Sequence, residues 1–231
     1  MPAPDAASDP VSDPPPSGRG ICDRADPSLR LCVDFESPLA DRSSRGAAID
    51  AISVSAMDRD GERAAALTAA STIHVHEAVE LDVDRLTLDM WIRPNGTPAG
   101  GARYWILDNN TQYAASFTDT RKARCVIGSA SVDSDPLADD GRFHHVACAY
   151  DGAKLKVFVD GDVSRCKDVA GPIPTTGADG LAIGANLSGS DAAPVFSESF
   201  VGGIDDVRVW ARGDLDVCAM AHRTGCRTTC P

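Results

Sequence analysis

The sequence has few aromatic residues, few basic residues and no long apolar run. No stretch approaches the roughly 18 consecutive apolar residues that a transmembrane helix needs, so no membrane span is predicted. The chain has 22 Lys and Arg against 34 Asp and Glu, a net charge of −12. This balance argues against nucleic acid as a partner, because phosphate binding requires a basic surface. The apolar content of 43% in 231 residues is that of one ordinary folded domain or two small ones.

The chain also lacks the paired C-x-x-C spacing of most zinc sites, although it contains eight cysteines. An even set of cysteines spread along a chain predicts disulfides and an oxidising compartment. We therefore expect an extracellular, periplasmic or cell-surface-anchored protein. Residues 1–20 contain no apolar stretch, so the sequence as given holds no signal peptide. The predicted half-cystines are Cys22, Cys32, Cys125, Cys148, Cys166, Cys218, Cys226 and Cys230.

Part of the disulfide pattern can be argued from position. Residues 122–128 and 143–150 have the pattern of strands on either side of a loop at 133–141. In a hairpin centred within that loop, Cys125 would face Cys148. Cys22 and Cys32 are expected to form a local disulfide. Cys218, Cys226 and Cys230 are expected to link the C-terminal tail to the domain, with Cys166 as one partner.

The composition changes near residue 20. Six of the 15 prolines fall within the first 19 residues, together with Ala, Ser and Asp. Such a segment cannot bury a core, so we predict a disordered linker over 1–20. We predict one folded domain over 21–231, with a cysteine-rich C-terminal tail from about 213 to 231.

The folded part is predicted to be all-β. Leu86, Leu88, Met90 and Ile92 alternate with other residues, which is typical of a half-buried strand. Many short strands separated by turn residues indicate a β-sandwich or barrel. One short helix is expected over Asp214–Arg223, with Asp214 as its N-cap. The expected strands are Arg30–Glu36, Thr72–His76, Leu86–Arg93, Tyr104–Asp108, Tyr113–Thr118, Lys122–Gly128, Phe143–Tyr150, Lys154–Asp160, Gly180–Gly184 and Gly203–Trp210.

Three segments together resemble a known family. Residues 86–94 read LTLDMWIRP, an alternating strand with a Trp before a Pro-Gly loop. Residues 142–162 read RFHHVACAYDGAKLKVFVDGD, two strands with Asp151-Gly152 as a hairpin turn. Residues 200–214 read FVGGIDDVRVWARGD, a closing strand followed by the expected helix. Their order and spacing resemble the laminin G-like jelly-roll domain of the concanavalin A-like lectin/glucanase superfamily.

The resemblance implies a two-sheet antiparallel jelly-roll β-sandwich whose relatives are mostly binding modules. Many members hold a calcium ion, which prefers carboxylate and carbonyl oxygens. In related jelly rolls the Asp of the Ile-Asp pair, here Asp205, helps to hold the ion with a loop near the first strand. The matching loop is 39–46, which contains Asp41. Asp41 and Asp205 are therefore the candidate ligands of a structural Ca²⁺. The alternative is that Asp205 simply accepts hydrogen bonds from loop amides.

The superfamily also contains glucanases, so hydrolysis has to be weighed. A retaining glycosidase needs two carboxylates about 5 Å apart. Glucanases of this fold place them in an E-x-D-x-x-E run, and the chain contains no such run. We therefore expect no enzymatic activity. Only five of the acidic residues are glutamates: Glu36, Glu62, Glu77, Glu80 and Glu198.

Two groups of residues are candidates for binding. Sugar-binding side chains are expected around one strand end, where aromatic rings could stack and Asp and Asn could hydrogen-bond; an ordinary Asp/Asn turn is the alternative. His74 and His76 share one strand face, a geometry that could bind zinc, but no third ligand is apparent and surface histidines are the simpler interpretation. The candidate ligand-binding residues are Tyr104, Trp105, Asp108, Asn109 and Asn110.

The sequence therefore favours an exported, non-enzymatic binding or adhesion module. Its partner would be a glycan or a cell-surface protein, bound at loops of one rim or along the concave sheet. Two alternatives stay open. One is an accessory or degenerate domain of a secreted carbohydrate-active enzyme, and the other is a purely structural protein of the cell envelope.

Overall fold

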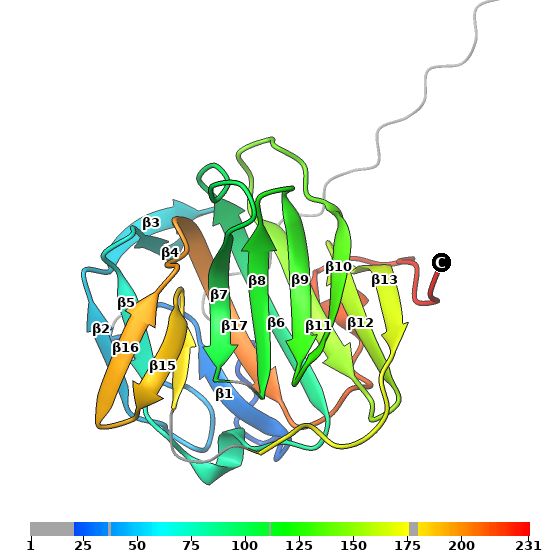
Figure 1. Cartoon of the computed structure of the whole chain (residues 1–231), viewed down its shortest axis with the longest axis horizontal. Helices are drawn as coiled ribbons and strands as arrows, with labels where there is room; N and C mark the ends of the chain where they lie inside the picture. The colour runs from blue at the N-terminus through cyan, green and yellow to red at the C-terminus, as the bar shows by residue number, and fades with distance from the viewer. Residues whose placement is uncertain (1–20, 37, 111, 176–179) are drawn as a thin grey trace, which may run out of the picture.

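The structure, a computed structural model, describes residues 21–36, 38–110, 112–175 and 180–231. The linker predicted for 1–20 lies outside these residues. Within them, the chain forms two antiparallel β-sheets packed face to face and one smaller hairpin (Figure 1). The antiparallel sandwich expected from the sequence is confirmed.

The larger sheet has eight strands, in the order β13-β12-β11-β6-β17-β4-β3 with β1 paired to β17. Strands β6 and β17 pair at its centre, and β11 lies on the other side of β6. The strands are β1 (Leu29–Val33), β3 (Ser55–Arg59), β4 (Glu62–Leu67), β6 (Leu86–Pro94), β11 (His144–Tyr150), β12 (Lys154–Val159), β13 (Asp162–Asp168) and β17 (Gly202–Trp210).

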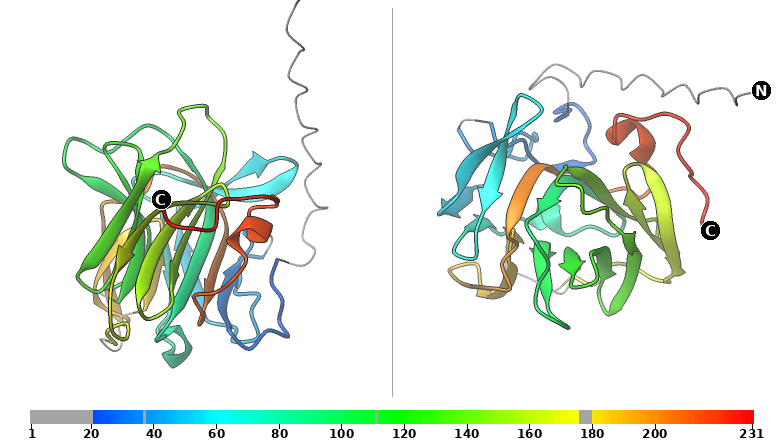
Figure 2. Two further views of the ribbon diagram at one scale, coloured as in Figure 1. Left: turned by 90° about the vertical axis from the view of Figure 1, so that its right-hand side faces the viewer. Right: turned by 90° about the horizontal axis from the view of Figure 1, so that it is seen from above.

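The smaller sheet has seven strands in the order β10-β9-β8-β7-β14-β5-β2, and strands β15 and β16 form a separate hairpin. The turned views in Figure 2 show the two sheets stacked, with the short C-terminal helix on the far side of the larger sheet. The strands are β2 (Ile49–Ile52), β5 (Thr72–Val75), β7 (Arg103–Asn109), β8 (Tyr113–Thr118), β9 (Lys122–Ile127), β10 (Ala130–Pro136), β14 (Leu181–Ile183), β15 (Asn186–Ser190) and β16 (Ala193–Ser197).

The core lies between the two sheets. Leu86, Leu88, Met90 and Ile92 of β6 are completely buried, as their alternation predicts. They belong to one apolar cluster with inward residues of the seven-stranded sheet such as Phe117. Each buried side chain of this size contributes about 1.5–3 kcal/mol through removal of apolar surface from water. This packing fixes which residues of each strand face outward.

Tight turns connect the strands at the end of the larger sheet. Asp151-Gly152 joins β11 to β12, which confirms the expected hairpin. Asp160-Gly161 joins β12 to β13, and both residues have positive φ, 49° and 83°. Two consecutive positive φ values are the requirement of a type I′ turn, which Asp-Gly meets with little strain.

The hairpin predicted between residues 122–128 and 143–150 is wrong. Residues 130–136 form β10, which pairs with β9, whereas β11 lies between β6 and β12 in the other sheet. The disulfide Cys125–Cys148 is nevertheless present. Both cysteines point into the core from opposite sheets, so the bridge crosses the sandwich. The pairing is confirmed, but for a different physical reason.

The expected helix over Asp214–Arg223 is shorter than predicted. Helix α1 spans Val217–Met220. Its N-cap is Asp216 and not Asp214, because the Asp216 carboxylate accepts the N–H of Ala219 at 3.1 Å. A single turn leaves little helical hydrogen bonding, so covalent links have to hold the tail.

The other three disulfides match the expected pattern. Cys22 pairs with Cys32, Cys166 with Cys230, and Cys218 with Cys226. No cysteine is free, which agrees with an oxidising compartment. In the described part of the chain, no helix is long and apolar enough to cross a membrane.

The disulfide between the sheets generates the first prediction. Replacing Cys125 and Cys148 together by alanine removes a link that closes 23 residues. The chain-entropy relation gives a loss of about 3 kcal/mol in unfolding free energy. For a domain of this size, we expect the melting temperature to fall by about 10 °C. Thermal unfolding without reductant measures it. An unchanged melting temperature would show that packing alone holds the two sheets.

Candidate functional site

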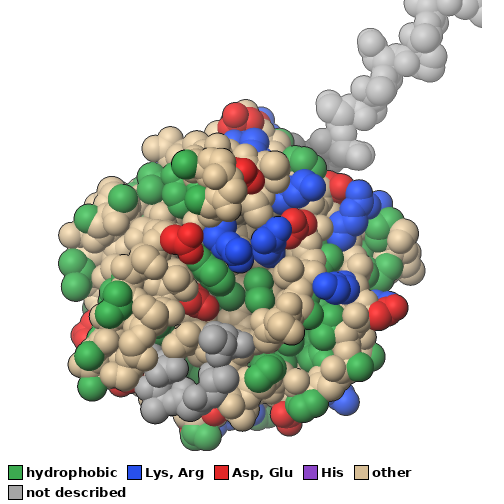
Figure 3. All heavy atoms as spheres, viewed as in Figure 1, with side chains coloured by type: hydrophobic (Ala, Val, Ile, Leu, Met, Phe, Trp, Pro, Cys, Tyr) green, Lys and Arg blue, Asp and Glu red, His purple; other side chains and the backbone are tan. Residues whose placement is uncertain are grey.

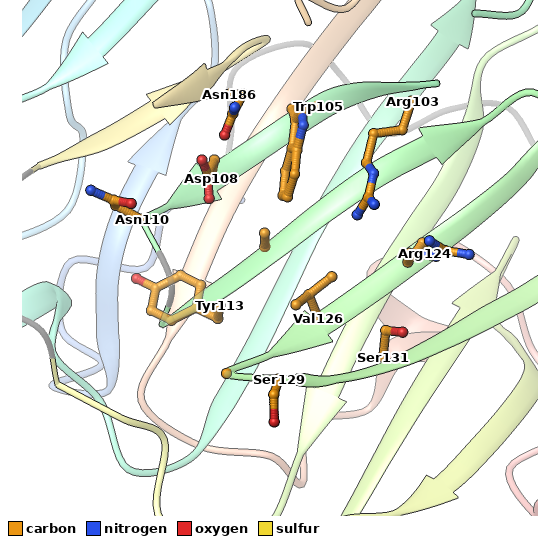
Figure 4. Close-up of a pocket in the computed structure, with 12 residues that line it drawn as sticks. Arg103, Trp105, Asp108, Asn110, Tyr113, Arg124, Val126, Ser129, Ser131 and Asn186 are labelled. Atoms are coloured by element: carbon orange, nitrogen blue, oxygen red, sulfur yellow. The ribbon is translucent and has the colours of Figure 1, made fainter. Parts of the chain in front are cut away.

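A pocket opens on the outer face of the seven-stranded sheet, over β7 to β10. Its volume is about 410 Å³. In Figure 3, basic and acidic side chains gather near the middle of this face, which is the face turned to the viewer in Figure 1. The lining residues, most of them labelled in Figure 4, are Arg103, Trp105, Asp108, Asn110, Tyr113, Ala114, Arg124, Val126, Gly128, Ser129, Ser131 and Asn186.

The pocket exists because small side chains face outward from its floor. Ala114 on β8 and Gly128 after β9 line it together with Val126. Longer side chains from the neighbouring strands, Arg103 and Arg124, stand around them. Small-ligand sites are usually concave hollows of this kind in the protein surface.

A β-bulge in β7 brings two important side chains to the same face. Trp105 and Asp108 are three residues apart, so a regular strand would point them to opposite faces. The register with β8 shifts between Trp105 and Leu107, where one extra residue is inserted. Both Trp105 and Asp108 therefore line the pocket, while Ile106 and Leu107 are buried in the core.

The indole of Trp105 is held in place from two directions. Its Nε1 donates a hydrogen bond to a Glu198 carboxylate oxygen at 2.7 Å. The Arg103 guanidinium lies over the ring, 5.2 Å from its centroid. In Figure 4, the indole stands between Arg103 on one side and Asp108 with Asn186 on the other. A ring fixed in this way loses little conformational entropy when a ligand packs against it.

Asp108 joins the pocket to the β15–β16 hairpin. Its Oδ2 accepts the N–H of Leu187, the second residue of β15, at 2.9 Å. The side chain is almost fully buried. Burial raises the pKa of Asp108 to about 6, and the Leu187 hydrogen bond opposes that rise. The carboxyl therefore changes its charge at mildly acidic pH.

The pocket is locally basic in an acidic protein. Arg124 forms a two-pronged ion pair with Asp133 of β10, at 2.5 and 2.8 Å. The hydrogen bond with Asp133 raises the pKa of Arg124 further. The two guanidiniums of Arg103 and Arg124 thus present N–H donors at one side of the pocket, opposite the Asp108 carboxyl (Figure 4).

The structure separates the five predicted ligand-binding residues into two groups. Trp105, Asp108 and Asn110 line the pocket. Tyr104 packs against the core, with its ring 6.3 Å from that of Phe200. Asn109 is buried, and its amide donates to the carbonyl of Leu81, in the 3-10 helix Val79–Leu81, at 3.4 Å. Strand alternation could have excluded Tyr104, because it adjoins Trp105.

Sequence reasoning missed several lining residues. Arg103 and Arg124 share strand faces with Trp105 and Val126 at a spacing of two, which was a usable signal. Asn186 comes from β15, a strand that the sequence pattern does not predict. The unpredicted strands are rich in small or charged residues: β2, β3, β4, β10, β13, β15 and β16.

The carboxylate of Asp41, a candidate calcium ligand, accepts hydrogen bonds from backbone amides. Its two oxygens accept the N–H groups of Cys32, Ser43 and Ala47 at 2.8–3.0 Å, and the Ser43 hydroxyl at 2.8 Å. These bonds hold the loop that follows β1 against that strand. They give Asp41 a structural role in this loop.

The second candidate, Asp205, lies in a different cluster. Among the described residues, the acidic group around it consists of Glu62, Asp205 and Asp206. The guanidinium of Arg59 reaches all three carboxylates, at 3.1, 3.2 and 2.6 Å respectively. Burial and the neighbouring Asp206 raise the pKa of Asp205, and the Arg59 guanidinium opposes that rise. These residues do not fit a calcium ion, because Arg59 already supplies the positive charge.

The sequence of the folded part matches one family model. The laminin G model described as the concanavalin A-like lectin/glucanases superfamily matches residues 67–213, more than half of the chain. The chain belongs to this superfamily. The resemblance noted in the sequence is thereby confirmed. No curated protein sequence shows significant similarity to the chain.

Solved structures share the fold at low sequence identity. Domain 4 of the GH43 extracellular arabinanase AbnA from Geobacillus stearothermophilus, in complex with arabinotriose, has a TM-score of 0.63 and 17% identity. That match covers 84% of this chain and 98% of that domain. The botulinum neurotoxin serotype G binding domain has a TM-score of 0.63 and 13% identity, and the match covers 84% of this chain and 50% of that one. The chain thus spans about half the length of the toxin domain.

The buried carboxyl of Asp108 generates a pH prediction. Its pKa in the folded chain, about 6, lies above the value of 3.8 expected without burial. The folded state therefore binds the proton more tightly, and stability falls as pH rises from about 4 to 6. Asp108→Asn removes this loss, so its stability relative to wild type should grow by roughly 3 kcal/mol between pH 4 and 7.

Denaturant unfolding of both proteins across that pH range measures the difference. Asp168→Asn is the matched control, because that carboxylate is 87% exposed. If the difference in unfolding free energy between Asp108→Asn and wild type stays constant across this pH range, Asp108 ionises as freely as an exposed carboxyl.

The ion pairs of Arg59 with the carboxylates around Asp205 lead to a prediction about the effect of calcium on stability. Because Arg59 takes the place of a cation, we expect the melting temperature in millimolar CaCl₂ to stay within about 1 °C of that in EDTA. Thermal unfolding without reductant compares the two. A clear rise in melting temperature with calcium that disappears in Asp205→Ala would establish the ion predicted from the sequence. It would also show that Arg59 does not take the place of a cation.

Proposed function

We propose that the chain is a non-enzymatic, exported carbohydrate-binding module whose ligand occupies the pocket over β7 to β10. The observation that carries the proposal is the fixed indole of Trp105 beside a carboxyl and two guanidiniums in one hollow. A carbohydrate ligand needs both kinds of surface, because a sugar ring has apolar C–H faces and polar hydroxyl edges.

The chemistry of each side chain suits that role. The indole offers a rigid apolar face on which the C–H face of a sugar ring can pack. The Asp108 carboxyl accepts hydrogen bonds from hydroxyl groups, and the guanidinium of Arg103 donates them. The volume of about 410 Å³ lies in the range of pockets that hold small molecules.

The similar structures support a glycan over a protein surface. The arabinanase domain is described in complex with arabinotriose. Another similar structure concerns the dependence of botulinum neurotoxin type C cell entry on two ganglioside molecules. The alternative of an accessory domain in a secreted carbohydrate-active enzyme is compatible with the same pocket, because the arabinanase domain is itself one part of an enzyme.

The lining of the pocket supports binding without hydrolysis. Among the described residues that line it, Asp108 is the one carboxyl. Hydrolysis by a retaining or an inverting mechanism ordinarily needs a pair of carboxylates that flank the scissile bond. A protein on the cell surface as partner and a purely structural role in the envelope are the other outcomes that the binding experiment distinguishes.

A glycan screen followed by calorimetry tests the proposal. The panel includes arabinotriose, longer arabino-oligosaccharides, sialylated oligosaccharides and uronic-acid oligosaccharides. For the tightest ligand we expect Trp105→Ala to weaken binding about tenfold or more, equivalent to ~1.4 kcal/mol. Trp105→Phe keeps a ring for packing and should lose less.

The matched control is Phe143→Ala. Phe143 is also a half-buried aromatic ring with an arginine over it, since the Arg93 guanidinium lies 5.3 Å from its centroid. It lies outside the pocket, so glycan affinity should not change. Equal loss in Trp105→Ala and Phe143→Ala would point to general destabilisation. Binding to none of the glycans would reject the proposal and direct the search to protein partners.

A further inference from the structure

A second cluster of polar side chains lies beside β5, apart from the pocket. His74 in β5 and His76 directly after it are two residues apart, and their rings approach to 4.7 Å between centroids. Asp191 lies in the turn between β15 and β16, 115 residues from His76. The fold thus supplies the third ligand that the sequence does not reveal.

The donor atoms are spaced as a metal site requires. His74 Nε2 lies 3.3 Å from Asp191 Oδ1, and His76 Nδ1 lies 3.2 Å from Asp191 Oδ2. One ligand atom from each of the three side chains falls within 4.8 Å of the others. Around a tetrahedral zinc ion with bonds of about 2.1 Å, neighbouring ligand atoms are roughly 3.4 Å apart. Small side-chain movements would therefore suffice to coordinate an ion.

The surrounding contacts are those of an oriented metal site. The other ring nitrogen of His76, Nε2, lies 2.9 Å from a carboxylate oxygen of Asp50. Metal-binding histidines almost always donate their second N–H to a carboxylate or carbonyl in this manner. The N–H of Glu77 donates to Asp191 Oδ1 at 2.9 Å and fixes that carboxylate. These contacts are independent of the ligand spacing and point to the same use.

Gly180 leaves the space beside the two nearest ligand atoms open. A Cβ at this position would lie 2.6 Å from His74 Nε2 and 2.9 Å from Asp191 Oδ1. Its φ of 75° also favours glycine. A side chain here would therefore fill the space between His74 and Asp191 where an ion would bind.

We propose that His74, His76 and Asp191 form a Zn²⁺ site that fastens the β15–β16 hairpin to β5. Two imidazoles and one carboxylate are a ligand set that suits zinc. His76 and Asp191 are partly exposed, at 35% and 29%, so a fourth position is open to water. All eight cysteines are in disulfides, so no thiolate competes for the ion.

Carboxylates flank both nitrogens of the His76 ring. Asp50 lies 2.9 Å from Nε2, and Asp191 lies 3.2 Å from Nδ1. Because Asp191 belongs to the hairpin turn and both histidines to the sheet side, the ion would connect two segments distant in sequence.

The test uses the tag-free chain, treated with EDTA and then dialysed against Zn²⁺ at pH 7.5. Bound zinc is measured by elemental analysis, and affinity by calorimetry. We expect one zinc per chain, a dissociation constant in the micromolar range or below, and a melting temperature raised by several degrees. Asp191→Asn keeps the shape and the Glu77 contact, and should weaken zinc binding about tenfold or more.

The matched control is His144→Gln. His144 also lies between two carboxylates, 2.9 Å from Asp160 and 3.2 Å from Asp140. The adjacent His145 contacts Asp89 instead, so no second histidine shares this cluster. Zinc binding should be unchanged in this variant. Absence of binding at about 100 μM zinc, or binding that Asp191→Asn leaves intact, would overturn the proposal. Because no glycan is used, this outcome is independent of the carbohydrate experiment.

Discussion

Three acidic side chains fasten the β15–β16 hairpin to the seven-stranded sheet, and both proposed sites depend on them. Asp108 accepts the N–H of Leu187, Glu198 directly after β16 accepts the indole N–H of Trp105, and Asp191 in the hairpin turn reaches His74 and His76. An isolated two-stranded hairpin is marginally stable in water. The contacts that hold it are therefore the same ones that shape the pocket and gather the candidate metal ligands.

Much of the fold could be predicted from the sequence, because apolar residues alternate along several of its strands. The pattern of Leu88, Met90 and Ile92 indicated a core strand, and the three family-like segments indicated the sandwich. The pairing of Cys125 with Cys148 was predicted with the wrong geometry. Both residues are inward positions of different sheets, and local spacing cannot distinguish a bridge across a sandwich from one within a hairpin.

The candidate site was less predictable for two physical reasons. The bulge in β7 places Trp105 and Asp108 on one face, and a one-residue insertion leaves no mark in a pattern read with period two. The partners Asn186, Leu187 and Asp191 belong to weakly patterned strands far along the chain. In the same way, Arg59 reaches Asp205 and Asp206 from a separate strand, so the local sequence around Asp205 did not reveal these ion pairs.

Amide NMR shift mapping with the tightest oligosaccharide of the panel tests whether the pocket is the binding site. We expect the shifted amides to cluster in β7, β8 and β9 and to extend to Leu187 in β15, because the ligand would contact the pocket and perturb the Asp108 bond to the hairpin. The eight-stranded sheet should be unaffected. Shifts concentrated on that sheet, or on its C-terminal tail, would contradict the assignment of the pocket as the binding site.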